Sequence, residues 1–414
     1  ILISYLSDFQ KIIGGSSIMR IKTVEMYTLN IPFYCDRVSK HMHRALTHSE
    51  RVYVYRTELD NGIIGYGENL SDESSNIERV VGQNPLAILQ DDSIGTGIQM
   101  SLFDVVGRSL EVPAYQMLGT KVRDRCPISW WDIDMPPEDW MEEAKESIQR
   151  GYTSIKLKAR PWRDIFDQIH KVGSVVPENY KFDIDFNGFL RSADSAIPVL
   201  QELDQHPNVA YYESPFYLGT DLEGAGRLQT AVINPIVEHF NEDCLHARVC
   251  GGFVVGGAAS GTRRVGALCA SFDKPFWLQM VGTGITTAYA MHLGAILTHS
   301  QLPAITCHEL WEHHLLKEGL EVSGGMISVP ELPGLGVEVD ESALEYYRVE
   351  PGTPTLTELY KQQQHVCRVH IPDSGGGENV HDFAGESVYY PAFSEGEYPG
   401  FARGVWMEVI EVGL

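Results

Sequence analysis

Three carboxylates, each at the end of a predicted strand, are the strongest chemical signal in the sequence. Asp185 ends "FDID", Glu213 ends "AYYE" and Glu238 ends "PIVE", with 28 and 25 residues between successive members. A single acid at a strand end is often only a loop cap or a surface charge. Three in consecutive strand–helix units are different, because a barrel places successive strand ends side by side.

Like charges that converge at one rim repel one another unless a cation bridges them. A set of oxygen ligands favours a hard divalent ion, so we expect Mg²⁺, with Mn²⁺ or Ca²⁺ as alternatives. His239 is a rival ligand because it follows Glu238 directly. We expect the side chain of Glu238 to be the inward one.

Two lysines lie one strand earlier in the chain. In "YTSIKLKARPW", a two-residue period places Lys156 and Lys158 on one face and apolar residues on the other. A solvated face is the simple interpretation, but Lys158 precedes Asp185 by 27 residues, so both lysines would point at the carboxylate rim of a barrel. Nearby positive charge lowers the pKa of a lysine and makes it usable as a base. A base beside a metal ion suits removal of the proton α to a carboxylate.

The surrounding elements predict how these residues are positioned. Residues 19–128 contain alternating strand patterns, a hairpin signal at Asp60-Asn61-Gly62 and helical stretches, which together indicate a small α+β domain. Residues 129–325 alternate strands and amphipathic helices in units of roughly 25–30 residues, which indicates an α/β barrel of the TIM type. Residues 326–414 form a C-terminal segment that we expect to pack back on the first domain. Residues 1–18 look like an extension ahead of a natural start at Met19.

Composition excludes several classes of partner. Lys+Arg number 32 and Asp+Glu 56, a net charge of −24 that argues against nucleic acid and anionic membranes. The seven cysteines contain no CxxC pair, so we expect neither a disulfide framework nor a zinc site, and a reduced, cytoplasmic setting. No apolar run reaches the ~18 residues of a membrane helix. We expect a small-molecule carboxylate as the substrate and a homo-oligomer as the assembly.

The motifs "KLKAR", "DIDFNG", "YYESPF", Gly256-Gly257 and "SVPELPGLGVEVDE" resemble the mandelate racemase/muconate lactonizing branch of the enolase superfamily. The resemblance covers nearly the whole chain from Met19. It implies a modified (β/α)₇β barrel with an α+β capping domain, and a base that produces an enediolate stabilised by Mg²⁺.

The resemblance also assigns roles to individual residues. It makes Asp185, Glu213 and Glu238 the metal ligands. It makes Lys158 the base and places Lys156 beside it, in contact with the substrate carboxylate. Asn187 corresponds to the asparagine of the D-x-N motif.

The chain departs from the family where a second proton-transfer group would lie. The corresponding positions are Gly251 and Gln279, and neither can exchange a proton. The segment from Glu238 to Gly256 is short for a helix plus a strand, so the register there is open. His246 could fill the gap, although a lone histidine in a loop is more often structural.

Other polar residues are weaker candidates for contact with the substrate. Glu309, in "TCHELWEHH", lies where the family can place an acid near the substrate carboxylate, whereas His308, His313 and His314 could equally cap a helix or face solvent. The stretch "DRVSKHMHRALTHSE" corresponds to a mobile loop of the family that closes over the substrate. It is either a solvated loop or a source of substrate contacts, and its basic residues are Lys40, His41, His43, Arg44 and His48, of which His41, His43 and Arg44 are the candidates.

With one lysine face and no evident second base, we expect a one-base reaction: β-elimination (dehydration) of a hydroxy acid or sugar acid. A racemase, epimerase or cycloisomerase of the same family is the alternative within this chemistry. A metal-binding relative without turnover is the alternative from another class.

Overall fold

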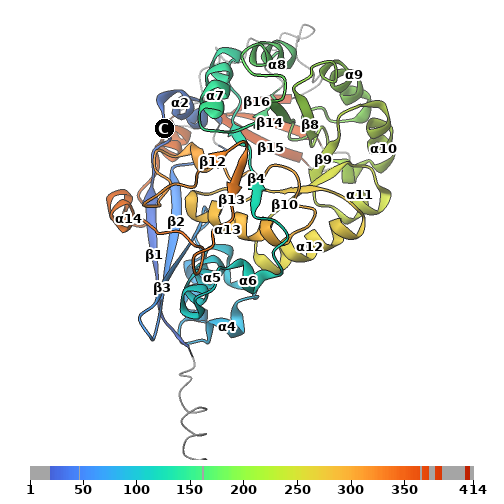
Figure 1. Ribbon diagram of the computed structural model, residues 1–414. Helices are drawn as coiled ribbons and strands as arrows, with labels where there is room; N and C mark the ends of the chain where they lie inside the picture. Colours follow the sequence, from blue (N-terminus) through green and yellow to red (C-terminus); the bar gives the residue numbers. More distant parts are fainter. Residues whose placement is uncertain are drawn as a thin grey trace, which may run out of the picture.

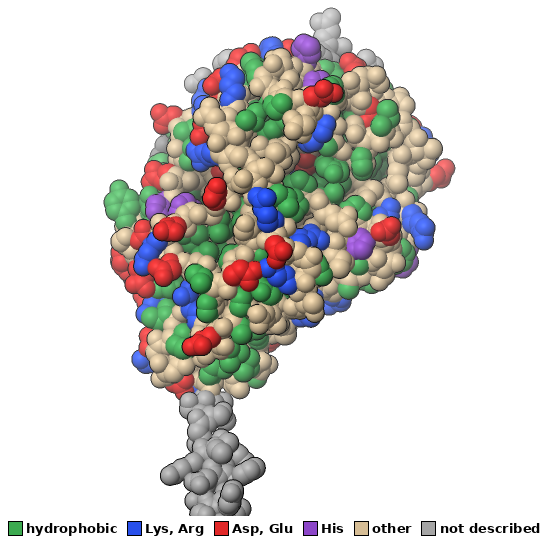
Figure 2. All heavy atoms as spheres, in the orientation of Figure 1, with side chains coloured by type: hydrophobic (Ala, Val, Ile, Leu, Met, Phe, Trp, Pro, Cys, Tyr) green, Lys and Arg blue, Asp and Glu red, His purple; other side chains and the backbone are tan. Residues whose placement is uncertain are grey.

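The computed structural model describes residues 19–45, 47–160, 163–363, 366–372, 378–384 and 406–410. Figure 1 shows the N-terminal strands β1–β3 on one side of a curved barrel ringed by helices. Acidic and basic side chains are interspersed over the face in Figure 2, so the excess negative charge is not gathered into one patch on that face.

The capping domain is built on a three-stranded antiparallel sheet of order β1-β2-β3. The predicted hairpin joins β2 to β3, and Gly62 adopts a positive φ of 82° in its turn. Helix α5 lies so close to β3 that a Cβ atom on Gly67 would be 2.1 Å from the carbonyl oxygen of Gly97. The elements are β1 (Ile21–Asn30), α2 (Asp36–Ala45), β2 (Arg51–Leu59), β3 (Ile64–Asn69), η1 (Ser74–Asn76), α3 (Ile77–Val80), α4 (Pro85–Ile88), η2 (Asp92–Ile94), α5 (Thr96–Leu110) and α6 (Tyr115–Leu118).

Helix α2 corrects the expectation of a loop at the start of the basic stretch. Asp36 in the first turn and Arg44 in the last complement the helix dipole. Val38 and Met42, four residues apart on one face, are both fully buried. This amphipathic pattern is short, and its buried histidines make it look polar in the sequence.

Seven parallel strands form one curved sheet in the order β5-β6-β7-β8-β9-β10-β11, and each strand is followed by a helix. The strands are β5 (Trp130–Asp132), β6 (Ser154–Lys158), β7 (Lys181–Asp185), β8 (Val209–Glu213), β9 (Ile236–His239), β10 (Gly252–Val255) and β11 (Phe276–Leu278). The helices are α7 (Pro137–Gln149), α8 (Ile165–Gly173), α9 (Ala193–Leu203), α10 (Leu222–Ala231), α11 (Glu242–Ala247), α12 (Ala259–Ser271) and α13 (Gly284–Ile296). The architecture is a TIM-type barrel with an N-terminal capping domain.

The segment after Glu238 and the last segment of the barrel are both shorter than regular strand–helix units. The short segment after Glu238 holds a helix, α11, of only six residues before β10 begins. The strand pattern of the last segment, "AITCHEL" (residues 304–310), is realised only in part: Ala304 bridges Ile128 and Ile305 bridges Gln279, while η4 (His308–Leu310) is a 3₁₀ turn.

The C-terminal segment contacts both units of the chain. Strand β12 (Val322–Ser323) pairs with β13 (Met326–Ser328), and β13 pairs with β4 (Arg125–Pro127). The elements that follow are α14 (Glu341–Tyr347), α15 (Leu356–Gln363), β14 (Val366–Pro372), β15 (Glu378–Ala384) and β16 (Trp406–Ile410). A bridge joins Arg348 to Leu29 of β1.

Buried His292 on α13 links this segment to the capping domain. Its Nδ1 accepts from the Tyr115 amide at 3.3 Å, and its Nε2 donates to the Leu335 carbonyl at 3.0 Å. The described helices include none that is long and apolar enough to cross a membrane.

Candidate active site

The two lysines of β6 meet the carboxylates of the neighbouring strands inside the barrel. Lys158 pairs in register with Asp185, and Asp185 with Glu213, so their side chains share the inner face. The ammonium group of Lys158 donates to Asp185 Oδ2, and at 3.2 Å to Asn187 Oδ1. That of Lys156 donates to Glu213 Oε2 and lies 3.4 Å from Asp185 Oδ2. Burial explains why these charges pair so closely, since both lysines are at most 8 % exposed.

The pKa values of the two lysines shift in opposite directions. Burial lowers the pKa of Lys158, and the positive charge of Lys156 lowers it further, against the attraction of Asp185. Burial also opposes the charged form of Lys156, but Glu213 and Asp185 outweigh it and raise the pKa of Lys156 above its ordinary value. The arrangement therefore has one lysine that is easier to deprotonate and one that stays positive.

The third predicted carboxylate faces a different way. Glu213 pairs with Val237 on β9, so the side chain two residues on, His239, lies on the same side as Glu213. His239 Nε2 is 3.5 Å from Glu213 Oε1. The Glu238 carboxylate accepts from the Ser214 hydroxyl at 2.7 Å and from the Leu218 amide at 3.3 Å, in the loop after β8. The expectation that Glu238 points inward and His239 does not is thus reversed by the register.

Aromatic side chains and a histidine complete the surroundings of the lysines. Lys156 Nζ is 5.3 Å from the ring centroid of Trp277, and Lys158 Nζ is 6.0 Å from that of Trp131. The His48 ring, from the capping domain, lies 5.3 Å from the Trp131 ring. Burial, followed by the charges of Lys158 and Lys156, lowers the pKa of His48 to about 4. These side chains carry no motif, and only the fold brings them together.

Comparison with known proteins places this arrangement in a family. Residues 139–244 and 253–343 match the model of the enolase C-terminal domain-like family. A racemase of N-succinyl-L-Arg/Lys from Bacillus cereus is 24% identical over 53% of this chain and 65% of its own length. A D-gluconate dehydratase from Thermoproteus tenax is 24% identical over 62% of this chain and 56% of its own length. This chain therefore spans less than two thirds of either relative.

The fold agrees with these matches. The solved structure of a mandelate racemase/muconate lactonizing family protein from Azoarcus sp. EbN1 superposes with a TM-score of 0.67, at 21% identity, over 81% of this chain and 99% of its own. The family match and the shared fold together support the mandelate racemase/muconate lactonizing branch of the enolase superfamily. Muconate cycloisomerases are also among the solved structures that share the fold.

Members of the enolase superfamily generally use Mg²⁺, and the donor chemistry of this barrel fits such an ion. Glu213 Oε1 is buried and has no hydrogen-bond partner within the described residues. Burial and the charge of Asp185 raise the pKa of Glu213, and burial raises that of Glu238 to about 7, so a cation would relieve the cost of ionising both. The lysine ammonium groups already contact Asp185 and Glu213, and the described residues contain no trio of side chains spaced as a metal site.

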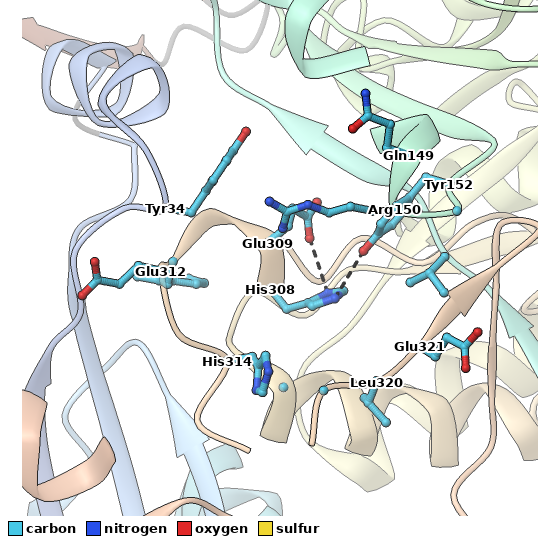
Figure 3. Close-up of a pocket in the computed structure, with 15 residues that line it drawn as sticks. Tyr34, Gln149, Arg150, Tyr152, His308, Glu309, Glu312, His314, Leu320 and Glu321 are labelled. Carbon is cyan, nitrogen blue, oxygen red and sulfur yellow. Dashed lines mark hydrogen bonds and ion pairs between the residues drawn. The ribbon is translucent and has the colours of Figure 1, made fainter. Parts of the chain in front are cut away.

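Glu309 lies apart from the lysines in this member of the superfamily. Its Oε1 accepts from the Trp131 amide at 2.8 Å, and burial raises its pKa to about 8. It lines a cavity of about 610 Å³ together with Tyr34, Arg150 and His308. Figure 3 shows His308 between Glu309 and Tyr152, and its ring nitrogens lie 3.4 Å and 3.2 Å from those side chains. The lining of this cavity includes neither lysine of β6.

The three basic candidates of the capping domain are buried in or at the end of α2 and have partners of their own. His41 Nε2 is 2.6 Å from Asp139, and His43 Nε2 is 2.6 Å from Glu50. Arg44 donates to the Asp134 carboxylate at 3.0 Å. These contacts join α2 to its neighbours, so the structure does not gather the three side chains at the lysine cluster.

Of the remaining candidate residues, one lies at the lysine cluster and three do not. Gln279 lies at the cluster, where its Oε1 accepts from Lys156 at 2.8 Å. His246 is exposed on α11, where its Nδ1 donates to the Glu242 carbonyl at 2.7 Å. The rings of His313 and His314 are tilted relative to each other with centroids 5.3 Å apart. Their Nδ1 atoms accept from the backbone amides of Leu315 and Leu316, respectively.

Proposed function

We propose that this protein removes the proton α to the carboxylate of a hydroxy acid or sugar acid and acts as a dehydratase. The observation that carries the proposal is the pair of buried lysines on β6 in contact with the carboxylates that end β7 and β8. Sugar-acid dehydratases such as the D-gluconate enzyme are among the matched relatives, which supports this reaction class.

The two lysines would have separate roles. Lys158, whose pKa is lowered, would accept the α-proton on Nζ while the electron pair of the broken C–H bond moves onto the substrate carboxylate. Lys156, whose pKa is raised, would stay positive and hold that carboxylate. In a substrate with hydroxyls on both the α and β carbons, as in a sugar acid, the Lys158 ammonium would then give its proton to the departing β-hydroxyl, so that the products are water and an enol that becomes a 2-keto acid.

Asp185 and Glu213 would hold Mg²⁺, or Mn²⁺ in its place. When bound, the ion would supply positive charge against the charge that develops on the substrate. We also infer that residues 304–305 stand in for the eighth strand of a (β/α)₇β barrel, since they bridge β11 to the segment before β5.

Racemisation or epimerisation is the second candidate. One matched relative is a racemase, and His48 has no hydrogen-bond partner within the described residues, so it could act as a second proton-transfer group. Cycloisomerisation remains the further alternative of the same chemistry.

The test is exchange of the α-hydrogen in D₂O. The protein is incubated with MgCl₂ and a library of sugar acids and hydroxy acids, and ¹H NMR follows the α-hydrogen. We expect loss of that signal and growth of a 2-keto acid for at least one substrate, and Lys158→Ala should abolish both. Lys171→Ala, at an exposed lysine of α8, is the matched control and should change neither. Exchange with inversion would indicate a racemase. If no acid exchanges, or if Lys158→Ala exchanges like the wild type, the proposal is wrong.

A further inference from the structure

The cavity of about 610 Å³ that contains Glu309 is separate from the lysine cluster. It lies where the capping domain, the end of α7 and the segment after η4 meet, and its walls include Tyr34, residues 149–152 and residues 319–322. Its volume is in the range of sites for small molecules. Neither lysine of β6 lines it, and the proposed reaction uses none of its residues.

Buried Glu309 gives this cavity an acceptor atom that is not satisfied. Its side chain is 2% exposed, and while Oε1 accepts from the Trp131 amide, Oε2 has no hydrogen-bond partner among the described residues. The Nδ1 atom of His308 is 3.4 Å away, but the Thr306 hydroxyl lies closer to that nitrogen, at 3.0 Å. Burial lowers the pKa of His308 to about 4, so the ring is neutral and supplies no charge. A buried carboxyl oxygen without a donor is costly, so a donor from a bound molecule would be favourable.

The charges behind Glu309 favour a cationic donor. Burial raises the pKa of Asp132, and the charges of Glu143 and Glu309 raise it further, so these three carboxyl groups repel one another. Arg37 is already paired with Glu143. An ammonium group at Glu309 Oε2 would therefore compensate negative charge that this part of the chain leaves in excess.

Arg150, after the last turn of α7, brings a positive charge to the same cavity. Its guanidinium lies 5.1 Å and 5.3 Å from the ring centroids of Tyr34 and Trp130. Its Nε donates to Glu146 at 2.8 Å, and its two terminal amino groups have no hydrogen-bond partner in the described part of the chain. Figure 3 shows the Arg150 side chain extending toward Glu309, and its charge acts on that carboxyl group. The only ion pair of Arg150 within the described ranges is nevertheless the one with Glu146.

We propose that this cavity binds a free α-amino acid with an apolar side chain, whose carboxylate pairs with Arg150 and whose ammonium group donates to Glu309 Oε2. A guanidinium with two unused amino groups can hold a carboxylate through two parallel hydrogen bonds. An α-amino acid is the smallest common molecule that carries both charges. Its side chain would pack against Trp311, Leu320 and Val322, which line the same cavity. The site does not depend on the proposed function.

Calorimetric titration of L-leucine, L-methionine and L-phenylalanine into the full-length protein tests the proposal. We expect at least one of them to bind. N-acetylation of that amino acid removes the ammonium group, and its methyl ester removes the carboxylate. Each derivative should bind the wild type about tenfold or more weakly, because each loses one charge-assisted hydrogen bond.

Variants assign the two contacts to residues. Glu309→Gln keeps an acceptor for the Trp131 amide, and Arg150→Met keeps an apolar chain against the rings of Tyr34 and Trp130. Each should weaken binding of the amino acid by about tenfold or more. Lys145→Met is the matched control, because Lys145 is on the same helix, is 42% exposed and also pairs with a nearby glutamate; it should bind like the wild type.

Lys158→Ala separates this site from the lysine cluster and should leave binding of the amino acid unchanged. If Lys158→Ala abolishes binding, the amino acid occupies the cluster and the inference is wrong. It is also overturned if none of the three amino acids binds at millimolar concentration, or if either derivative binds as tightly as its parent. Glu309→Gln that melts like the wild type and still binds with full affinity would overturn it as well. If that variant does not fold, the two derivatives, measured on the wild type, decide the question.

Discussion

Replacing Lys156 by Met should expose how strongly the buried charges of the barrel depend on one another. Both Lys156 and Glu213 are fully buried, and Lys156 is the charged donor to Glu213 Oε2. Removing one partner of a buried ion pair leaves the other charge without compensation and costs about 3–5 kcal/mol. Lys156→Met should therefore lower the free energy of unfolding by about that amount. Glu213→Gln should have an effect of similar size.

The double variant Lys156→Met/Glu213→Gln contains no uncompensated charge at this position. Its cost should fall short of the sum of the single variants by about 2 kcal/mol or more, measured by urea denaturation in EDTA. The exposed pair Lys317–Glu338, with side chains 60% and 69% exposed and 3.0 Å apart, is the matched control. Its coupling should not exceed about 1 kcal/mol. A coupling at Lys156–Glu213 no larger than that of the control would refute the account of the cluster.

Three further outcomes follow from other parts of the molecule. Burial lowers the pKa of His292 to about 4, below the ordinary 6.5, so its contribution to stability is complete above pH 6.5 and is lost as the pH falls toward 4. His292→Gln should reduce this pH-dependent loss of unfolding free energy by roughly 3 kcal/mol, measured by urea denaturation at a series of pH values. An unchanged dependence of the unfolding free energy on pH would contradict this. Gly256→Ala would place a Cβ atom 2.1 Å from the Gln279 carbonyl and should cost about 1–3 kcal/mol of stability, whereas Gly226→Ala, whose nearest neighbour atom is 3.8 Å away, should cost nothing. His48→Ala should raise KM for the acid by about 2–10-fold, as expected for one lost hydrogen bond, with the melting temperature unchanged; an unaltered KM would place the substrate elsewhere.

The period of the sequence was enough to predict which faces the β6 residues occupy. In "SIKLK", alternate positions are charged and apolar, and a strand can present them only to opposite sides. The alternation of strand patterns with amphipathic helix patterns likewise predicts the repeated strand–helix units. It could not predict α2, because a helix whose buried positions include His41 and His43 has the composition of a loop until their partners, Asp139 and Glu50, are known.

The sequence could not predict which strand face the side chains of Glu238 and His239 occupy, for a different reason. Adjacent residues of a strand point to opposite faces, so the pattern says that one of them is inward but not which one. That choice depends on the hydrogen-bonded register with β8, where Glu213 pairs with Val237. Glu309 shows a similar limit, since the φ of 55° at Cys307 turns the chain just before it.

The position of Gln279 narrows what the lysines can accomplish. An acid or base there could act on the substrate from a second side, but the Gln279 amide cannot exchange a proton, and its oxygen is held by Lys156. Gly251 offers no side chain at the other expected position. Lys158 is therefore the main proton-transfer group of the cluster. It can accept the α-proton and then donate a proton to a hydroxyl that leaves from the same side of the substrate. A single base with both duties favours elimination over inversion, because inversion needs a proton delivered to the opposite face. His48 is the side chain that could reverse this preference, since it stands over the same indole ring as Lys158 without a hydrogen-bond partner in the described residues.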